Sequence, residues 1–252
     1  MLSALTVCSN DTDNLQLGKL VQQPRRIKSI SNKEISLDIP LTDSLNAANG
    51  LMTSIALIPF TPPAQPSEMG LENLSTRLNP SCSGTRLGAG KCDRNAILIS
   101  PWTTNSWLRN LNLTGFNSFI STQKSSSRLT ITTIAMNRDG PTDNRACYAL
   151  GISIEGTQVL VHNCTTAGAQ GSKSYGIATK TLAPGPNACI GYHAQQPLVS
   201  IEPHQRWAHG LLLEGSTNAA VVLRDGGGAG TGQGWAINND TEHTLQAVHV
   251  IY

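Results

Sequence analysis

The densest group of chemically active side chains lies in Glu202-Pro-His-Gln-Arg-Trp-Ala-His209. Arg206 could bind a carboxylate through two hydrogen bonds, because a guanidinium presents paired donors. His204 and His209 could transfer a proton near neutral pH, where an imidazole ordinarily titrates. The alternative is a loop whose side chains hydrogen-bond backbone carbonyls between neighbouring coils.

A second polar group is Arg224-Asp225, which follows the apolar run Val221–Leu223 and precedes a glycine-rich segment, Gly226–Gly234. A carboxylate beside a loop with little side-chain bulk could approach a substrate closely. The alternative is a surface ion pair between Arg224 and Asp225 at a corner. The glycine-rich segment lacks the Lys-Ser/Thr and the helix start of a phosphate-binding loop, so we do not expect nucleotide binding.

Asp139 and Asp143 could form the carboxylate pair of an inverting hydrolase, which needs carboxyl groups about 6.5–9.5 Å apart. However, Asn137–Asn144 also has the composition of an ordinary turn, and no Asp-Asp corner pair is present. A hydrolase is therefore less favoured. His162 lies on the opposite face of its strand from Val161, so we expect it to point outward.

Four tryptophans stand at 102, 107, 207 and 235, although aromatic residues make up only 4% of the chain. Indole rings at a surface stack on sugars, and this makes Trp107, Trp207 and Trp235 candidate binding residues. The alternative is that these rings pack in the core or in a cap.

The six cysteines show no metal-site spacing, and we expect no structural metal. Cys82 and Cys92 bracket a short loop that a disulfide could close, whereas the pairing of Cys147, Cys164 and Cys189 stays open. Sequons begin at five asparagines, which would make an exported chain a glycoprotein: Asn10, Asn73, Asn112, Asn163 and Asn239.

Charge and hydropathy limit the classes of partner. The net charge is +2 and charged residues are 13% of the chain, with no basic run that could track phosphates, so we expect no nucleic acid. No segment approaches the roughly 20 apolar residues that span a bilayer, so we expect no membrane partner. The first eight residues lack the positive charge of a secretory signal, and an exported form would need a signal from outside this sequence.

These side chains are positioned by a repeat of short β-branched runs that end in polar corners. The clearest is Gln158-Val-Leu-Val-His-Asn-Cys-Thr165. Aligning Asn112, Asn137, Asn163, Glu214 and Asn238 gives gaps of 25, 26, 51 and 24, with a missing corner near Asn187. A period of about 25 residues without intervening helix patterns predicts a solenoid. Stacked coils place like residues over like residues, and corner asparagines can bond backbone groups left free by the bend.

The expected architecture is all-β: a single-stranded, right-handed parallel β-helix over residues 51–239. Residues 1–50 form an irregular segment or cap, with a short helix near 41–50 that could cover the open end of the first coil. Strands are expected at 51–60, 69–78, 96–99, 106–113, 118–120, 128–134, 150–154 and 157–161. Residues 240–252 carry no corner motif and form an atypical tail.

The chain resembles the pectin-lyase-like superfamily of right-handed β-helices, and more closely a branch of secreted microbial members. The resemblance is carried by Trp107-Leu-Arg-Asn-Leu111, Pro203–Gly210, Arg224-Asp225 and Gly230–Asn239. Members of that branch tend to carry His where this chain has Gln233, and they continue for further coils. The resemblance thus implies a shortened C-terminus here.

The resemblance implies a secreted polysaccharide lyase that cleaves a uronate polymer by β-elimination. His204 would be the base and Arg206 would neutralise the enolate, with His209 and Asp225 nearby, and Ca²⁺ could assist. Trp207, Arg224, Gln233 and Trp235 would bind the substrate. The alternatives are a non-catalytic β-helix that binds glycan along its long face and a glycoside hydrolase of the same fold. We expect a monomer with a polysaccharide partner.

Overall fold

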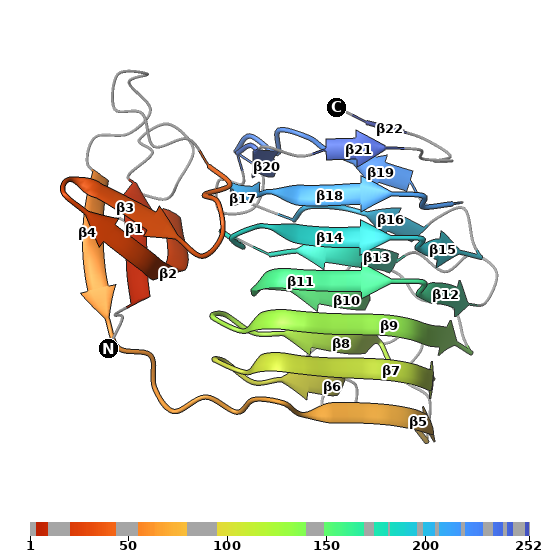
Figure 1. Cartoon of the computed structure of the whole chain (residues 1–252). Coiled ribbons are helices and arrows are strands. Elements are labelled where there is room, and N and C mark those ends of the chain that lie inside the picture. Colours follow the sequence, from red (N-terminus) through yellow and green to blue (C-terminus); the bar gives the residue numbers. More distant parts are fainter. Residues whose placement is uncertain are drawn as a thin grey trace.

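The computed structural model describes residues 4–9, 21–43, 55–79, 95–139, 149–168, 174–180, 182–195, 199–204, 207–217, 220–228, 234–238, 241–243 and 250–251. These residues form strands and turns, with no helix among them. Parallel strands stack coil upon coil into a β-solenoid (Figure 1), which confirms the predicted fold class. The helix expected near 41–50 falls largely outside the described residues.

Two parallel sheets run the length of the solenoid. The first, which we call the long sheet, contains β5 (Gly70–Arg77), β7 (Thr104–Thr114), β9 (Ser127–Arg138), β11 (Thr157–His162), β12 (Thr165–Gly168), β14 (Asn187–Ile190), β15 (His193–Ala194), β18 (Leu211–Glu214) and β21 (Thr241–His243). The second contains β6 (Asn95–Ile99), β8 (Ser118–Thr122), β10 (Leu150–Ile154), β13 (Ser174–Thr179), β16 (Val199–Ile201), β19 (Ala220–Val222) and β22 (Val250–Ile251). A short pair, β17 (Ala208–His209) and β20 (Ile237–Asn238), is also parallel.

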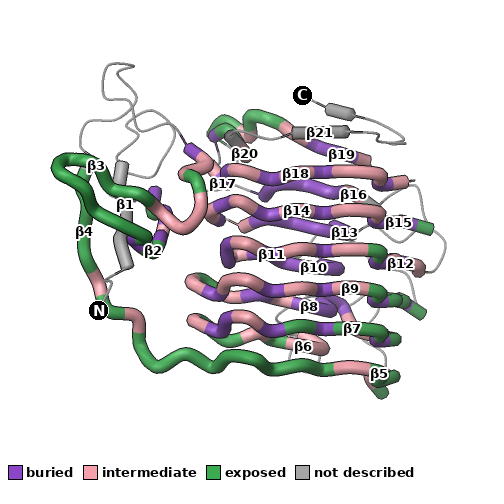
Figure 2. Tube along the Cα trace, in the orientation of Figure 1, coloured by how far each residue is buried: buried purple, intermediate pink, exposed green. Residues whose placement is uncertain are grey.

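Apolar side chains stack in columns between the two sheets. In the long sheet, the strand pairing aligns one inward column: Leu108, Ile131, Val161, Cys189 and Leu213. In the second sheet it aligns another: Ile97, Ile120, Ile152, Ile177, Ile201 and Val221. Alternate residues are buried along β11, β14 and β18 (Figure 2), as a half-buried strand requires, whereas all five residues of β10 are buried.

Two bends, five residues apart, delimit the central part of the long sheet in the coils of β5, β7, β9, β11, β14 and β18. The bend residues have positive φ, a backbone conformation that disfavours β-branched side chains and suits Gly and Asn. The first bend is formed by Glu68, Asn105, Arg128, Gln158 and Gly210, and the second by Asn73, Asn110, Thr133, Asn163, Gly191 and Gly215. In the remaining coil, the cis Gly185–Pro186 peptide stands at the first bend.

Asn163 stands at a bend, as predicted, but the predicted register is wrong: Glu214 aligns with His162 and not with Asn163. Asn112 pairs with Ala135, and Asn137 pairs with Thr114, so these two asparagines are not in one column. Asn187 does bond free backbone groups at a bend, as predicted for corner asparagines. Its Oδ1 accepts from Val159 N at 3.0 Å, and its Nδ2 donates to Pro184 O at 3.2 Å.

The described N-terminal residues form an antiparallel sheet in the order β3-β2-β1-β4. Its strands are β1 (Ala4–Ser9), β2 (Val21–Ser31), β3 (Glu34–Leu37) and β4 (Ile55–Phe60). The strand expected at 51–60 thus pairs with β1, and the described solenoid begins at β5. At the other end, β21 and β22 continue the two sheets into the tail predicted at 240–252.

The N-terminal sheet lies beside the solenoid, at the edge where the long-sheet strands start (Figure 1). Arg25 donates to Gly185 O at 2.9 Å, and Trp207 Nε1 donates to Asp43 Oδ2 at 2.7 Å. The N-terminal sheet does not cover the first described coil of the solenoid. Leu71 and Leu74 of this coil point inward, in register with buried leucines, but remain 37% and 42% exposed.

Candidate functional site

His204 is buried beside the Tyr175 ring, with 5.6 Å between ring centroids. Burial, followed by the positive charges of Lys180 and Arg224, lowers its pKa from 6.5 to about 4. The imidazole is therefore neutral at pH 7, as a base must be, but it is also covered. Arg206, its predicted partner, lies outside the described residues.

His209 is buried where the N-terminal segment meets the solenoid. Its Nδ1 shares a hydrogen bond of 2.6 Å with Thr42 Oγ1, whereas its buried Nε2 has no hydrogen-bond partner among the described residues. Burial, followed by the charge of Arg25, lowers its pKa to about 4. Trp207 also contacts this segment, through its bond to Asp43. Both side chains therefore contribute to packing between the two parts of the chain.

Arg224 pairs with Glu202 at 2.8 Å rather than with the adjacent Asp225. Burial raises the pKa of the Glu202 carboxyl, and the charge of Arg224 opposes that rise. Asp225 is exposed and its Oδ1 accepts from Gly227 N at 2.8 Å, so it closes the turn that leads towards Trp235. The alternative prediction, a surface ion pair between Arg224 and Asp225, is therefore wrong, because the Arg224 guanidinium pairs with the buried Glu202.

Trp235 is exposed, and its carbonyl accepts from Trp207 N at 2.9 Å. The structure thus brings the backbones of these two predicted binding residues together. Gln233 lies outside the described residues, as do Cys82 and Cys92 of the predicted disulfide. Cys164 and Cys189 are free thiols in the core, and burial raises the pKa of both.

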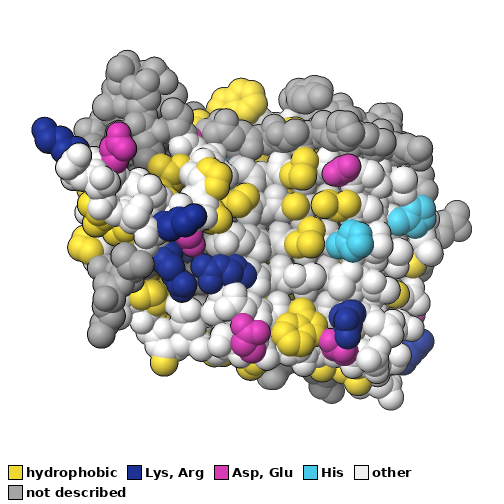
Figure 3. Space-filling model, in the orientation of Figure 1, with side chains coloured by type: hydrophobic (Ala, Val, Ile, Leu, Met, Phe, Trp, Pro, Cys, Tyr) yellow, Lys and Arg dark blue, Asp and Glu magenta, His cyan; other side chains and the backbone are white. Residues whose placement is uncertain are grey.

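A different surface is presented by the long sheet between its two bends. Its outward side chains form two columns, which we call the platform face (Figure 3). The columns follow from the strand register: Gly70, Trp107, Thr130, Leu160, Ala188 and Leu212 in one, and Glu72, Arg109, Thr132, His162, Ile190 and Glu214 in the other.

Trp107 is held at one end of this platform face. Its indole lies over Gly70 on the preceding coil, where a methyl group added to Gly70 would be 2.5 Å from Nε1 and 2.6 Å from Cζ2. The indole N–H donates to Glu72 Oε1, and Arg109 NH2 donates to Glu72 Oε2 at 2.7 Å. These bonds lower the pKa of Glu72, Arg109 contributing most. The ring remains 37% exposed, so it is fixed in place and open to solvent.

The rest of the platform face changes from polar to apolar along the solenoid. Thr132 Oγ1 and His162 Nδ1 are 3.2 Å apart, and His162 points outward as predicted. Leu160, Ala188 and Leu212 follow in the next coils of the neighbouring column. Sequence reasoning identified Trp107 but missed this arrangement, because the indole's support is a glycine 37 positions earlier.

Comparisons of the chain with protein-family models, with curated proteins and with solved structures found no match. Among the described residues, no three His, Cys, Asp or Glu side chains gather as a metal ion requires. None of the described segments forms an apolar helix of membrane-spanning length. Function is therefore inferred from the fold and the contacts of this chain alone.

Proposed function

We propose that the chain is a carbohydrate-binding β-solenoid and that the platform face is its binding surface. The observation that carries this proposal is the exposed Trp107 ring, which is held over Gly70 by its hydrogen bond to Glu72, a carboxylate that Arg109 also binds. An aromatic ring fixed before binding loses little conformational entropy when a sugar stacks on it.

The neighbouring groups suit an extended polymer. Coils in a parallel sheet repeat about every 4.8 Å, so the face offers a regular row of groups along the solenoid axis. Thr130 and Thr132 supply hydroxyls next to the ring, and Leu160 and Leu212 supply apolar contact further along. Sugars present both hydroxyl edges and apolar C–H faces, and the platform face offers a partner for each.

The experiment is affinity electrophoresis of the full chain through gels that contain neutral or uronate polysaccharides. We expect retardation on at least one polymer, and we expect Trp107→Ala to abolish most of it. Trp235→Ala is the matched control, because Trp235 is at least as exposed but lies outside the platform face. If Trp235→Ala lost its retardation and Trp107→Ala kept it, the binding surface would instead lie in the region around residues 202–235.

A more specific form of this proposal is that the chain is a secreted member of the pectin-lyase-like superfamily with polysaccharide lyase activity. The lyase chemistry depends on Arg206 together with His204, and the covered position of His204 favours binding over cleavage. Incubation with the retained polymer, with and without Ca²⁺, tests it. Ultraviolet absorbance from unsaturated uronate that disappears in Arg206→Ala would establish the lyase, and a flat trace would leave the binding function.

A further inference from the structure

A hollow lies between the N-terminal sheet and the solenoid, where β9 and β11 begin. Its volume is about 90 Å³, well above the roughly 10–15 Å³ that admits one water molecule. The hollow therefore has room for a group of several heavy atoms. Polar and apolar groups share the lining, which includes Phe60, Trp102, Ser125 and Gln158 beside the charged residues described next.

Three arginines line this hollow, from both parts of the chain: Arg25 and Arg26 from β2 and Arg128 from β9. Figure 3 shows the dark-blue side chains gathered between the N-terminal sheet and the solenoid. Arg25 is buried and donates to three backbone carbonyls, those of Pro24, Pro40 and Gly185. Burial lowers its pKa to about 10, so it stays charged at neutral pH.

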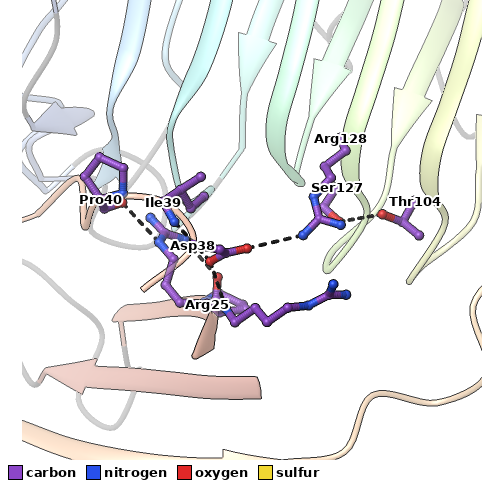
Figure 4. Close-up of polar contacts among 9 residues, drawn as sticks. Arg25, Asp38, Ile39, Pro40, Thr104, Ser127 and Arg128 are labelled. Carbon is purple, nitrogen blue, oxygen red and sulfur yellow. Dashed lines mark hydrogen bonds and ion pairs between the residues drawn. The ribbon is translucent and has the colours of Figure 1, made fainter. Parts of the chain in front are cut away.

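Asp38 is the one carboxylate among the described residues that line the hollow. Its Oδ1 accepts from the backbone N–H of Arg26 at 2.9 Å and of Ile39 at 3.1 Å. Its Oδ2 accepts from Arg128 NH2 at 3.2 Å (Figure 4). Only Arg128 binds this carboxylate through its guanidinium, so the described lining residues carry an excess of two positive charges.

The other groups at the rim also suit an anion. Thr104 and Ser127 hydroxyls are 3.1 Å apart on adjacent coils, and both line the hollow. The Arg26 guanidinium lines it as well and has no hydrogen bond to another described side chain. The hollow already binds one oxyanion group, the carboxylate of Asp38, through a guanidinium and backbone N–H groups.

We propose that this hollow is a second binding site, which takes an oxyanion group, a phosphate or a carboxylate, between Arg26 and Arg128. Guanidinium groups bind such oxyanions through charge-assisted hydrogen bonds, which strengthen where water is partly excluded. The hollow is formed by different residues from the platform face, so this proposal does not depend on the proposed function.

The test is isothermal titration of the full chain with inorganic phosphate, glucose 6-phosphate, glucuronate and glucose at constant ionic strength. We expect at least one of the three anions to bind and glucose to give no heat. The double variant Arg26→Gln/Arg128→Gln should weaken binding roughly tenfold or more. Arg77→Gln is the matched control, because Arg77 is an exposed arginine paired with Asp139 outside the hollow, and it should bind like the wild type.

A second variant separates loss of the site from loss of docking between the two parts. Asp38→Asn breaks the same ion pair with Arg128 but raises the local positive charge, so it should tighten anion binding. Weaker binding in Asp38→Asn, unchanged binding in the double variant, or no heat from any anion would each overturn the proposal. The relative affinities of inorganic phosphate, glucose 6-phosphate and glucuronate would show whether the group is bound free or on a sugar.

Discussion

At the scale of single residues, burial decides what the histidines of the predicted cluster can do. His204 and His209 are 5% and 1% exposed, and the pKa of each falls to about 4. The sequence placed two imidazoles five positions apart, but it could not show that one packs on Tyr175 and the other bonds Thr42. Those partners lie 29 and 167 positions away, so no local pattern reports them.

The depressed pKa of His209 predicts how stability depends on pH. An unfolded histidine titrates near 6.5, so between pH 6.5 and about 4 the unfolded chain binds a proton that the folded chain does not. The free energy of unfolding is therefore fully retained above pH 6.5 and falls as the pH drops through this window. At about 1.4 kcal/mol per pKa unit, the loss is on the order of 3 kcal/mol.

Thermal unfolding from pH 7 to pH 4 measures this effect. We expect His209→Gln to reduce the slope of the melting temperature against pH, because the variant lacks the titrating group. His193→Gln, on a half-buried residue at the solenoid surface that bonds Thr217, is the control. Parallel curves for the wild type and His209→Gln would contradict a neutral, buried His209.

At the scale of the strands and bends, much of the fold could be predicted and the register could not. Val159 and Val161 point inward as the alternation predicted, and β10 has the predicted bounds, Leu150–Ile154. The register failed because asparagine marks only some bends. Thr133 and Gly191 occupy equivalent positions, and a search for asparagine passes over them. The N-terminal sheet was missed because β1 and β4 are about fifty residues apart and pair without a local turn signal.

Thr133 gives a prediction about the second bend. Its φ is 56°, a conformation that is unfavourable for a β-branched residue, whereas the neighbouring bend residues are Asn110 and Asn163. Thr133→Asn should therefore stabilise the chain by about 1 kcal/mol. Thr132→Asn, in ordinary strand geometry, should be neutral or destabilising. A midpoint of urea unfolding that falls in Thr133→Asn would contradict the strain inferred at this bend.

At the scale of the whole molecule, the N-terminal sheet and the solenoid are joined by a few polar contacts. Asp43 is buried and accepts a hydrogen bond from the Trp207 indole N–H. The adjacent residue, Thr42, shares a hydrogen bond with His209. Asp38 and Arg25, which line the hollow, make further contacts. The sequence predicted a separate N-terminal segment, but these contacts join residues up to 167 positions apart and follow only from the folded chain.

Asp43→Ala tests this docking by hydrogen–deuterium exchange. Without the carboxylate the half-buried Trp207 N–H loses its acceptor, which costs up to about 1–3 kcal/mol. We expect faster exchange in β2 and unchanged exchange in β7 and β9, which contact the rest of the solenoid. Glu34→Ala, on an exposed residue of β3, should change neither. Equal acceleration in β2 and β9 would show that the two parts unfold together.

The central claim is that the Trp107 ring, held over Gly70, makes the platform face a glycan-binding surface. The most direct measurement is the retardation of Gly70→Ala on the polysaccharide gel that retards the wild type. A methyl group at Gly70 must displace the indole, so we expect retardation to fall about as far as in Trp107→Ala, roughly fivefold or more in Kd. Gly228→Ala, where an added methyl group meets nothing within 4 Å, should behave like the wild type. A folded Gly70→Ala chain with wild-type retardation would contradict the claim.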